Sequence, residues 1–323
     1  MRGIKRIRVF VRIEKESYMQ QEYTKIVSVQ DDLALDTLIL VPESPKAVLQ
    51  LVHGMCEHKE RYIPFMEFMV GQGYACVIHD HRGHGGSIKA AGDLGFFYEN
   101  GKVAVVEDIY QVMSEAKARF GALPYFLMGH SMGSMAVRCF IKKYDSEIDA
   151  LIVCGSPSAN PMAGAGIGLV RLLQKFKGAH GKSKLVDNMV MGSFEKPSKK
   201  EQTKNAWICS DKAVVEQYNA DPLCGYSFTL NGYEALLGLM KDTYSKEGWQ
   251  VAKSDLPIRF IAGVMDPCIT NVKAFQKAVD FMRDRGYRNV TSKLYKDMRH
   301  EILNETCKEH VYEDIATFCN RKV

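Results

Sequence analysis

The feature that most constrains the fold of this chain is an alternation of short, β-rich apolar runs with longer segments of helical periodicity. The expected strands cover residues 22–29, 34–41, 46–52, 74–79, 125–129, 149–155, 257–265 and 290–295. The expected helices cover residues 61–72, 102–119, 132–144, 271–285 and 306–321. A helix between two strands returns the chain to the same end of the sheet, so the strands pair in parallel. The pattern predicts an α/β fold with a mainly parallel central sheet flanked by helices.

The alternation stops between residues 157 and 254, where Gly-rich, Lys-rich and Met-rich segments carry helical patches such as "GLVRLLQKF". We expect an inserted helical cap over residues 157–254, which divides the core into residues 19–156 and 255–323. Residues 1–18 hold six Lys or Arg and two Asp or Glu. We expect them to be a basic N-terminal extension, either an upstream segment or the product of a misplaced start before Met19.

Composition limits the classes of function. The 323 residues are 46% hydrophobic and 25% charged, which is typical of a globular protein with a sizeable core. The sequence has no run of 18 apolar residues and no signal-peptide pattern, and its nine cysteines are odd in number and mostly lie in apolar runs. We therefore expect a cytoplasmic protein. Of the net charge of +5, residues 1–18 supply +4 (six minus two), so no nucleic-acid partner is expected.

The stretch "FLMGHSMGSM", residues 126–135, places Ser131 between Gly129 and Gly133, after an expected strand and before an expected helix. This is the context of the G-x-S-x-G nucleophile elbow, a strained turn that exposes the serine. Glycine is needed on either side because a side chain would crowd the neighbouring strand and helix. The context favours Ser131 as a nucleophile over a Gly-Ser turn that serves packing alone.

A serine nucleophile needs a base within hydrogen-bonding distance and an acid that orients the base. After this elbow the chain order is acid and then histidine. Asp266 directly follows the expected strand 257–265, and His300 follows the next one, so both are expected at the same edge of the sheet as Ser131. The alternatives lie in the loop before His300, in the cap and in the last helix: Asp297, His180 and His310.

The oxyanion formed in acyl transfer needs preorganised N–H donors, each contributing about 3 kcal/mol to stabilisation of the transition state. The residue after the nucleophile, Met132, supplies one backbone N–H at a helix N-terminus. The second N–H donor is expected in the loop after the early strand 46–52, within the segment "AVLQLVHGM". There His53-Gly54 allows the chain to turn, and Met55 presents its backbone N–H. His53 itself is interpreted as a structural hydrogen-bonding residue rather than a base.

Three histidines in "HDHRGHGGS", His79, His81 and His84, have the H-x-H-x-x-H spacing of some metal sites. A metallo-β-lactamase-like site requires Asp at the position of Gly83, and the sequence has neither H-E-x-x-H nor paired C-x-x-C motifs. We expect a structural loop here, with no metal and no cofactor.

Taken together, these motifs resemble serine hydrolases of the α/β-hydrolase fold, and among them the monoacylglycerol lipase and lysophospholipase group, which is serine aminopeptidase S33-like. The resemblance spans residues 22–322 and rests on "HGMCEHKERY" (53–62), "DHRGHGGS" (80–87), "GHSMGS" (129–134), "DPCIT" (266–270) and "RHEILNE" (299–305). "DPLCGYSFT" (221–229) also resembles the cap of that group. The resemblance to this group implies a catalytic triad of Ser131, Asp266 and His300. It also implies that Met55 and Met132 form the oxyanion hole.

The resemblance also implies a polar site near the head of the substrate, at His53, Gly54, Glu57 and Arg61. Glu57 and Arg61 match the group's E-H-x-x-R-Y segment, either as a salt bridge that shapes the loop or as direct contacts to a glycerol head group. Glu301, Asn304 and Glu305 are expected to fix the loop that carries His300. Dehalogenases and epoxide hydrolases carry Asp at the elbow, so Ser131 argues against both.

The expected function is hydrolysis of a carboxylic ester of a monoacyl lipid, a monoacylglycerol or a lysophospholipid, through an acyl-enzyme intermediate. A general carboxylesterase, or an aminopeptidase or amidase of the same fold, is the alternative within the class. A non-catalytic lipid-binding homologue is the alternative from another class. The expected partner is a small-molecule acyl ester, and the sequence does not predict an oligomeric state.

The cap has two further features that bear on lipids. The cap contains several large apolar residues, which either line an acyl channel or pack the cap onto the core. These residues are Leu169, Leu172, Leu173, Phe176, Met189 and Met191. Residues 171–204 hold nine Lys or Arg against three Asp or Glu. This charge is either a solvated face or a surface that makes transient contact with anionic membranes.

Overall fold

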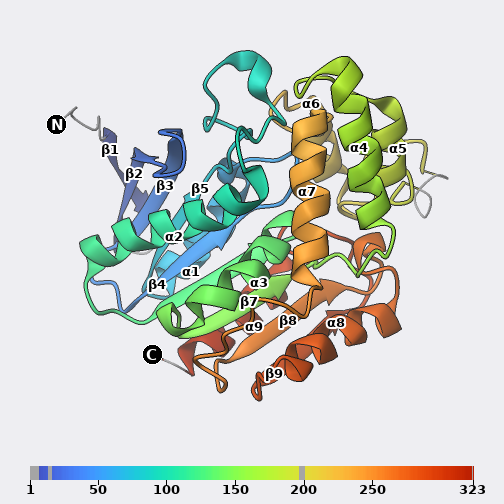
Figure 1. Ribbon diagram of the computed structural model, residues 1–323. Coiled ribbons are helices and arrows are strands. Elements are labelled where there is room, and N and C mark those ends of the chain that lie inside the picture. The colour runs from blue at the N-terminus through green and yellow to red at the C-terminus, as the bar shows by residue number, and fades with distance from the viewer. Residues whose placement is uncertain (1–6, 14–16, 196–200, 322) are drawn as a thin grey trace.

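A single sheet organises the molecule. The computed structural model describes residues 7–13, 17–195, 201–321 and 323, and within them nine strands pair side by side (Figure 1). In sheet order they are β1 (Ile7–Ile13), β2 (Ser17–Val27), β3 (Ala34–Pro42), β5 (Tyr74–His79), β4 (Ala47–Val52), β6 (Tyr125–His130), β7 (Ala150–Cys154), β8 (Ile258–Gly263) and β9 (Val290–Tyr295). From β5 to β9 the strands are parallel, whereas β1, β2 and β3 pair antiparallel. The predicted mainly parallel sheet is confirmed.

The sheet begins earlier in the chain than the sequence analysis predicted. β2 starts at Ser17 rather than near residue 22, and β1 pairs antiparallel with it, with Ile7 opposite Tyr23. The segment "IRVFVRI" has apolar residues at every second position, but its positive charge obscured this strand pattern. Residues 1–6 and 14–16 of the expected N-terminal extension lie outside the described residues.

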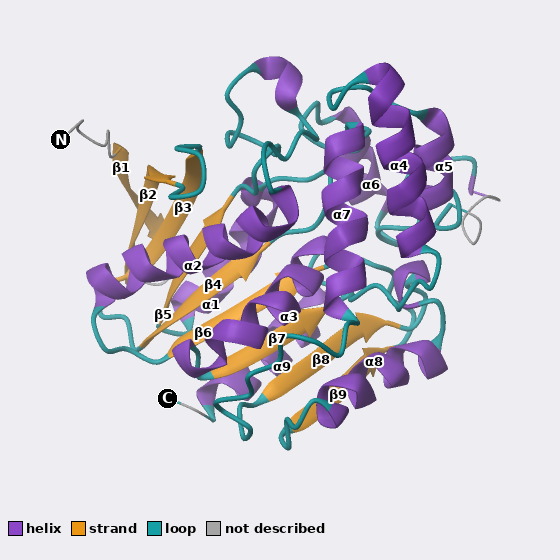
Figure 2. Ribbon diagram, viewed as in Figure 1, coloured by secondary structure: helices purple, strands orange, loops and turns teal. Residues whose placement is uncertain are grey.

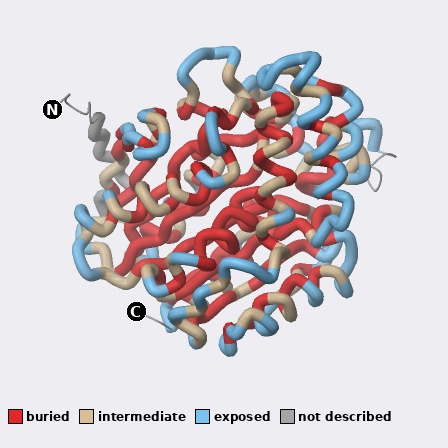
Figure 3. The backbone as a smooth tube through the Cα atoms, in the orientation of Figure 1, coloured by how far each residue is buried: buried red, intermediate tan, exposed pale blue. Residues whose placement is uncertain are grey.

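Helices cover both faces of the sheet (Figure 2). α2 (Gly101–Phe120), α3 (Met132–Tyr144) and α8 (Val272–Asp284) lie on the face toward the viewer, and α1 (Ile63–Gly71) and α9 (Lys308–Asn320) lie behind it. Side chains of β6 alternate accordingly, since Leu127 belongs to the first core cluster and Phe126 and Met128 to the second. The central strands β4, β5, β6 and β7 are buried throughout (Figure 3), and they consist of nearly continuous apolar runs.

The described residues between β7 and β8 include the helices α4 (Ala163–Lys177), α5 (Lys184–Met191), α6 (Lys212–Ala220) and α7 (Leu230–Thr243). α7 packs against both α3 and α4, so it connects the sheet layer to the helices above it. The contact with α4 is close, because a Cβ at Gly166 would lie 3.0 Å from Cδ1 of Leu237. No helix in the described part of the chain combines the length and apolar character needed to cross a membrane.

Candidate active site

Ser131 lies on a sharp turn between β6 and α3. Its backbone adopts φ 53° and ψ −117°, a conformation that L-residues rarely occupy. The neighbouring glycines are required by close contacts: a Cβ at Gly129 would lie 2.3 Å from the carbonyl oxygen of Gly133, and one at Gly133 would lie 2.1 Å from the carbonyl oxygen of Val52. This is the strained geometry that the strand-glycine-serine-glycine-helix sequence predicted.

Asp266 and His300 meet at the same edge of the sheet, after β8 and β9. Nδ1 of His300 lies 2.9 Å from Oδ2 of Asp266, and both residues are 3% exposed. The other carboxylate oxygen accepts the backbone N–H of Cys268 at 2.8 Å. A carboxylate acceptor selects the tautomer with hydrogen on Nδ1, which leaves the lone pair of Nε2 available.

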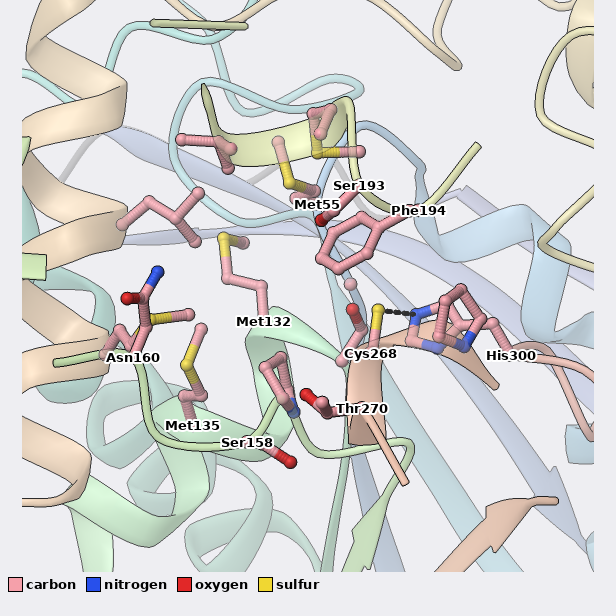
Figure 4. Close-up of a pocket in the computed structure, with 18 of the residues that line it drawn as sticks. Met55, Met132, Met135, Ser158, Asn160, Ser193, Phe194, Cys268, Thr270 and His300 are labelled. Atoms are coloured by element: carbon pink, nitrogen blue, oxygen red, sulfur yellow. Dashed lines mark hydrogen bonds between the residues drawn. The ribbon is translucent and has the colours of Figure 1, made fainter. Parts of the chain in front are cut away.

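Ser131 and His300 line one cavity of about 530 Å³ at the carboxyl ends of the parallel strands. Figure 4 shows Cys268 and His300 on one side of this cavity and Met132 and Met135 on the other. Nε2 of His300 lies 3.9 Å from Sγ of Cys268, and Oγ of Ser131 has no hydrogen-bonding partner among the described residues. The hydroxyl is therefore available to a ligand.

The two residues expected to supply oxyanion donors flank this cavity. Met132 is the first residue of α3, where backbone N–H groups have no intrahelical acceptor, and Met55 lies in the loop after β4. The N–H of Gly54 is already used, since it donates to Oε1 of Glu57 at 2.6 Å. Met55 lines the cavity beside Gly54, and its role as the donor of that loop stays a prediction.

A buried network connects the loop of Gly54 to the loop of His300. The Arg61 guanidinium donates to Oε2 of Glu57 at 2.7 Å and to both carboxylate oxygens of Glu301 at 2.7 and 2.6 Å. Glu301 directly follows His300, so one guanidinium holds both loops. Of the expected loop-fixing residues, Glu305 also takes part, because it accepts the backbone N–H of Arg299 at 2.8 Å.

His130 is a cavity-lining residue that the sequence analysis missed, although it is the variable residue of the G-H-S-M-G motif. Its Nδ1 lies 3.4 Å from Oε1 of Glu57 and 3.1 Å from the hydroxyl of Tyr62. Burial lowers the pKa of His130, but the hydrogen bond and charge of Glu57 outweigh burial and raise it above the ordinary value. The pKa of Glu57 is lowered despite burial, through its hydrogen bond with His130 and the charge of Arg61.

The four residues expected near the head of the substrate separate into two pairs. Gly54 and Glu57 line the cavity, whereas His53 and Arg61 lie behind this lining. His53 is fully buried, its Nδ1 donates to the carbonyl of Gly54 at 2.7 Å, and its Nε2 accepts the N–H of His81 at 2.9 Å. These bonds occupy both ring nitrogens of His53 within the protein.

The alternative catalytic residues lie away from Ser131. His180 is exposed and stacks on Phe96 at 3.7 Å between ring centroids, and both His310 and Asp297 are exposed. The segment between β7 and β8 contributes residues that the sequence did not single out, among them Trp207, whose ring centroid lies 5.0 Å from that of His300. Trp207 has no motif and is distant in sequence, so no sequence signal identified it.

The apolar lining differs in part from the expected set. Met189 and Met191 line the cavity, but four of the expected α4 residues do not, namely Leu169, Leu172, Leu173 and Phe176. Their place is taken by α7 through Leu236, Leu237 and Met240. The physical reason is that α4 faces α7 and the cavity through Gly166. The larger apolar side chains of α4 therefore lie outside the cavity lining.

The histidines of the H-x-H-x-x-H segment form a buried cluster of rings together with His53. His79 and His84 flank His81, with ring centroids 5.3 and 6.0 Å from it. Burial lowers the pKa of His79 to about 3 and that of His84 to about 4. These histidines are therefore neutral and pack the loop behind the cavity.

Known proteins resemble this chain in sequence and in fold. A model of the family described as serine aminopeptidase, S33, matches residues 43–307. The chain is 26% identical to a monoacylglycerol lipase of Mycolicibacterium smegmatis, over 85% of this chain and 88% of that lipase. It is 25% identical to the monoglyceride lipase of Homo sapiens, over 81% of this chain and 78% of that lipase.

A crystal structure of a highly thermostable carboxyl esterase from Bacillus coagulans, in complex with glycerol, superposes with a TM-score of 0.86. That esterase is 26% identical and covers 94% of this chain and 98% of its own. The fold is therefore the α/β-hydrolase fold that the motifs predicted. With a match over most of its length, and with monoacylglycerol lipases among its relatives, the chain belongs to the serine aminopeptidase S33 family of α/β-hydrolases.

Proposed function

We propose that the protein is a serine carboxylic-ester hydrolase that acts on a monoacyl lipid. The observation that carries this proposal is the strained Ser131, which lines an apolar cavity together with a His300 held by Asp266. The names of its relatives, monoacylglycerol lipases and a carboxyl esterase, support the same class of substrate.

In the proposed reaction, Oγ of Ser131 attacks the ester carbonyl while Nε2 of His300 accepts the hydroxyl proton. Asp266 orients the imidazole and stabilises the imidazolium that forms. The N–H groups of Met55 and Met132 stabilise the oxyanion. The imidazolium then protonates the leaving alcohol, and water, activated by His300, releases the fatty acid from the acyl-enzyme.

The lining of the cavity supports a single acyl chain as the ligand. Methionine and leucine side chains of α3, α5 and α7 make up much of it, and flexible sulfur-containing side chains adapt to flexible chains: Met132, Met135, Met189, Leu236, Leu237 and Met240. The head of the substrate would lie toward Gly54 and Glu57. We assign Arg61 a positioning role, because Glu57 and Glu301 already occupy its guanidinium.

A substrate panel tests the proposal. Monoacylglycerols and lysophospholipids are expected to be hydrolysed with higher kcat/KM than short p-nitrophenyl esters, because long chains fill the apolar cavity, and aminoacyl amides are expected to be poor substrates. Highest kcat/KM for amides would support the aminopeptidase alternative. Lipid binding without turnover of any ester would indicate the non-catalytic homologue and contradict the proposal.

We also propose that α4 and α5 contact a lipid surface during the reaction. Large apolar side chains are exposed there, with Phe176 81% exposed, Leu185 62% and Leu172 51%. Exposed Lys175 and Lys177 flank Phe176 on the same helix. Each basic residue close to an anionic surface contributes about 1 kcal/mol to binding.

The change Phe176→Ser is expected to weaken binding to anionic vesicles about tenfold, because burial of one large apolar side chain contributes about 1.5 to 3 kcal/mol. Co-sedimentation with vesicles of increasing anionic lipid content measures the effect. Val272→Ser is a matched control, since Val272 is 51% exposed on α8. Equal loss in both variants, or binding indifferent to anionic lipid and to salt, would reject the contact.

The cysteines support the cytoplasmic compartment expected from the sequence. All nine are free thiols, and eight of them are buried. Burial raises the pKa of several, including Cys76 and Cys319, and this protonation makes them unreactive.

A further inference from the structure

A second cluster of ligand-type side chains lies outside the catalytic cavity lining, where the loop after β4 meets the cap segment after α6. His58 comes from the loop, and Asp221 and Cys224 come from the cap segment. Nε2 of His58 lies 2.9 Å from Oδ2 of Asp221, and ligand atoms of all three residues lie within 4.8 Å of one another. His58 and Cys224 are buried and Asp221 is half-buried, so the cluster is enclosed but accessible from one side.

The donor set suits Zn²⁺. Imidazole nitrogen, thiolate sulfur and carboxylate oxygen are the three kinds of ligand that this ion takes, and tetrahedral coordination places such atoms about 3.3 to 3.6 Å apart. The 2.9 Å separation of His58 and Asp221 would widen by a few tenths of an ångström, and the separations that involve Cys224, which lie within 4.8 Å, would adjust to the same range. Zinc displaces the proton between Nε2 of His58 and Asp221 and the proton of the Cys224 thiol, and both protons leave to solvent. The resulting thiolate and the carboxylate balance the charge of the ion, and a solvent molecule completes the shell.

The surroundings of His58 have the form of a metal-ligating histidine. Its Nδ1 lies 2.7 Å from Oε2 of Glu60, which fixes the ring and directs Nε2 toward Asp221 and Cys224. Carboxylates commonly hold metal-bound histidines in this way. The second oxygen of Asp221 accepts the backbone N–H of Leu223 at 2.8 Å, so its carboxylate is oriented as well.

The loop after β4 and the segment after α6 are also held together by contacts that do not involve the side chains of His58, Asp221 and Cys224. The backbone N–H of Gly225 donates to the carbonyl of Cys56 at 3.0 Å, and the Tyr218 hydroxyl donates to the same carbonyl at 2.9 Å. The thiol of Cys56 in turn donates to the carbonyl of Tyr226 at 2.8 Å. The cluster is therefore preorganised, and substitution of one ligand leaves the junction in place.

We propose that His58, Asp221 and Cys224 form a zinc site that links the cap to the loop carrying Met55. Zinc bound there adds a cross-link between the cap and the core beside the oxyanion donor, and stabilises the junction in proportion to its occupancy. His58 lies 163 positions before Asp221, and Cys224 follows Asp221 closely, so no local spacing motif predicted the site.

Titration of chelator-treated, tag-free protein with ZnCl2 in a calorimeter tests the proposal. One zinc ion per chain is expected to bind, and Cys224→Ser and His58→Asn are each expected to weaken binding at least tenfold. Glu60→Gln retains all three ligands and is expected to weaken binding about tenfold through the histidine it orients. CoCl2 should produce a thiolate-to-cobalt absorption band that Cys224→Ser abolishes.

Cys307→Ser is the matched control, because Cys307 is an exposed free thiol that would capture zinc adventitiously. It should retain both the binding and the cobalt band. Failure of the wild-type protein to bind one equivalent, equal binding by wild type and Cys224→Ser, or loss of binding in Cys307→Ser would overturn the proposal. If Cys224→Ser does not fold, the Glu60→Gln titration and the cobalt band decide it.

Discussion

Replacing Ser131 with Ala should lower kcat for ester hydrolysis by a factor on the order of 10⁴ to 10⁶ and abolish labelling by a fluorophosphonate probe. The loss is large because, in the proposed mechanism, Oγ of Ser131 is the group that forms the acyl-enzyme. The protein should remain folded, since Ala keeps the Cβ that already occupies the strained turn and Oγ has no hydrogen-bonding partner among the described residues.

Ser114→Ala provides a matched control for this variant. Ser114 lies on α2, where its hydroxyl donates to the carbonyl of Tyr110, and it does not line the catalytic cavity. Its kcat and labelling should equal those of the wild type. Undiminished turnover by a folded Ser131→Ala variant would refute the assignment of the nucleophile.

Acidification should destabilise the protein steeply between pH 7 and pH 4.5. The folded-state pKa values of His79 and His84, about 3 and about 4, lie below the ordinary value near 6.5, so the unfolded chain binds protons that the folded chain excludes. Stability is therefore full above pH 6.5 and is lost as pH falls toward those values. Each histidine removes about 2.5 kcal/mol of unfolding free energy over this range.

Urea denaturation at several pH values measures this slope. The change His79→Leu should reduce the pH dependence of the unfolding free energy by the amount that corresponds to about one proton. The fold should tolerate this change, because both ring nitrogens of His79 are buried without hydrogen-bonding partners in the described structure. His310→Leu, at an exposed position, should leave the slope unchanged. A stability that does not vary between pH 7 and pH 4.5 would contradict the buried neutral state of the cluster.

The parallel part of the sheet was predictable because its strands are buried on both faces and separated by amphipathic helices. β6 and α3 differ from their predicted bounds by at most one residue, and the turn between them follows from two glycines around one serine. β1 was not predicted, because edge strands carry charge and lack a continuous apolar run. The fold signal thus came from strands that are buried on two faces, and it was weaker for this charged edge strand.

The part of the candidate site that follows strand ends was predictable for a topological reason. Parallel strands end at one edge of the sheet, so Asp266 and His300 had to approach each other once their strands were recognised. Contacts made by the cap had no such constraint. The positions of Trp207 beside His300 and of Leu237 in the cavity lining depend on how the helices pack across the cavity. The periodicity of the sequence does not specify this packing.

The shared guanidinium of Arg61 limits how lipids reach Ser131. Neither the loop of Gly54 nor the loop of His300 swings outward unless a nearly dry carboxylate loses its charged partner, which costs about 3 to 5 kcal/mol. The helices above the sheet meet one another through apolar side chains and through an exposed ion pair between Arg171 and Glu234, and such contacts separate and re-form more easily. Substitutions in those helices are therefore the route by which selection changes which lipids are admitted and how fast products depart, while the chemistry below stays constant.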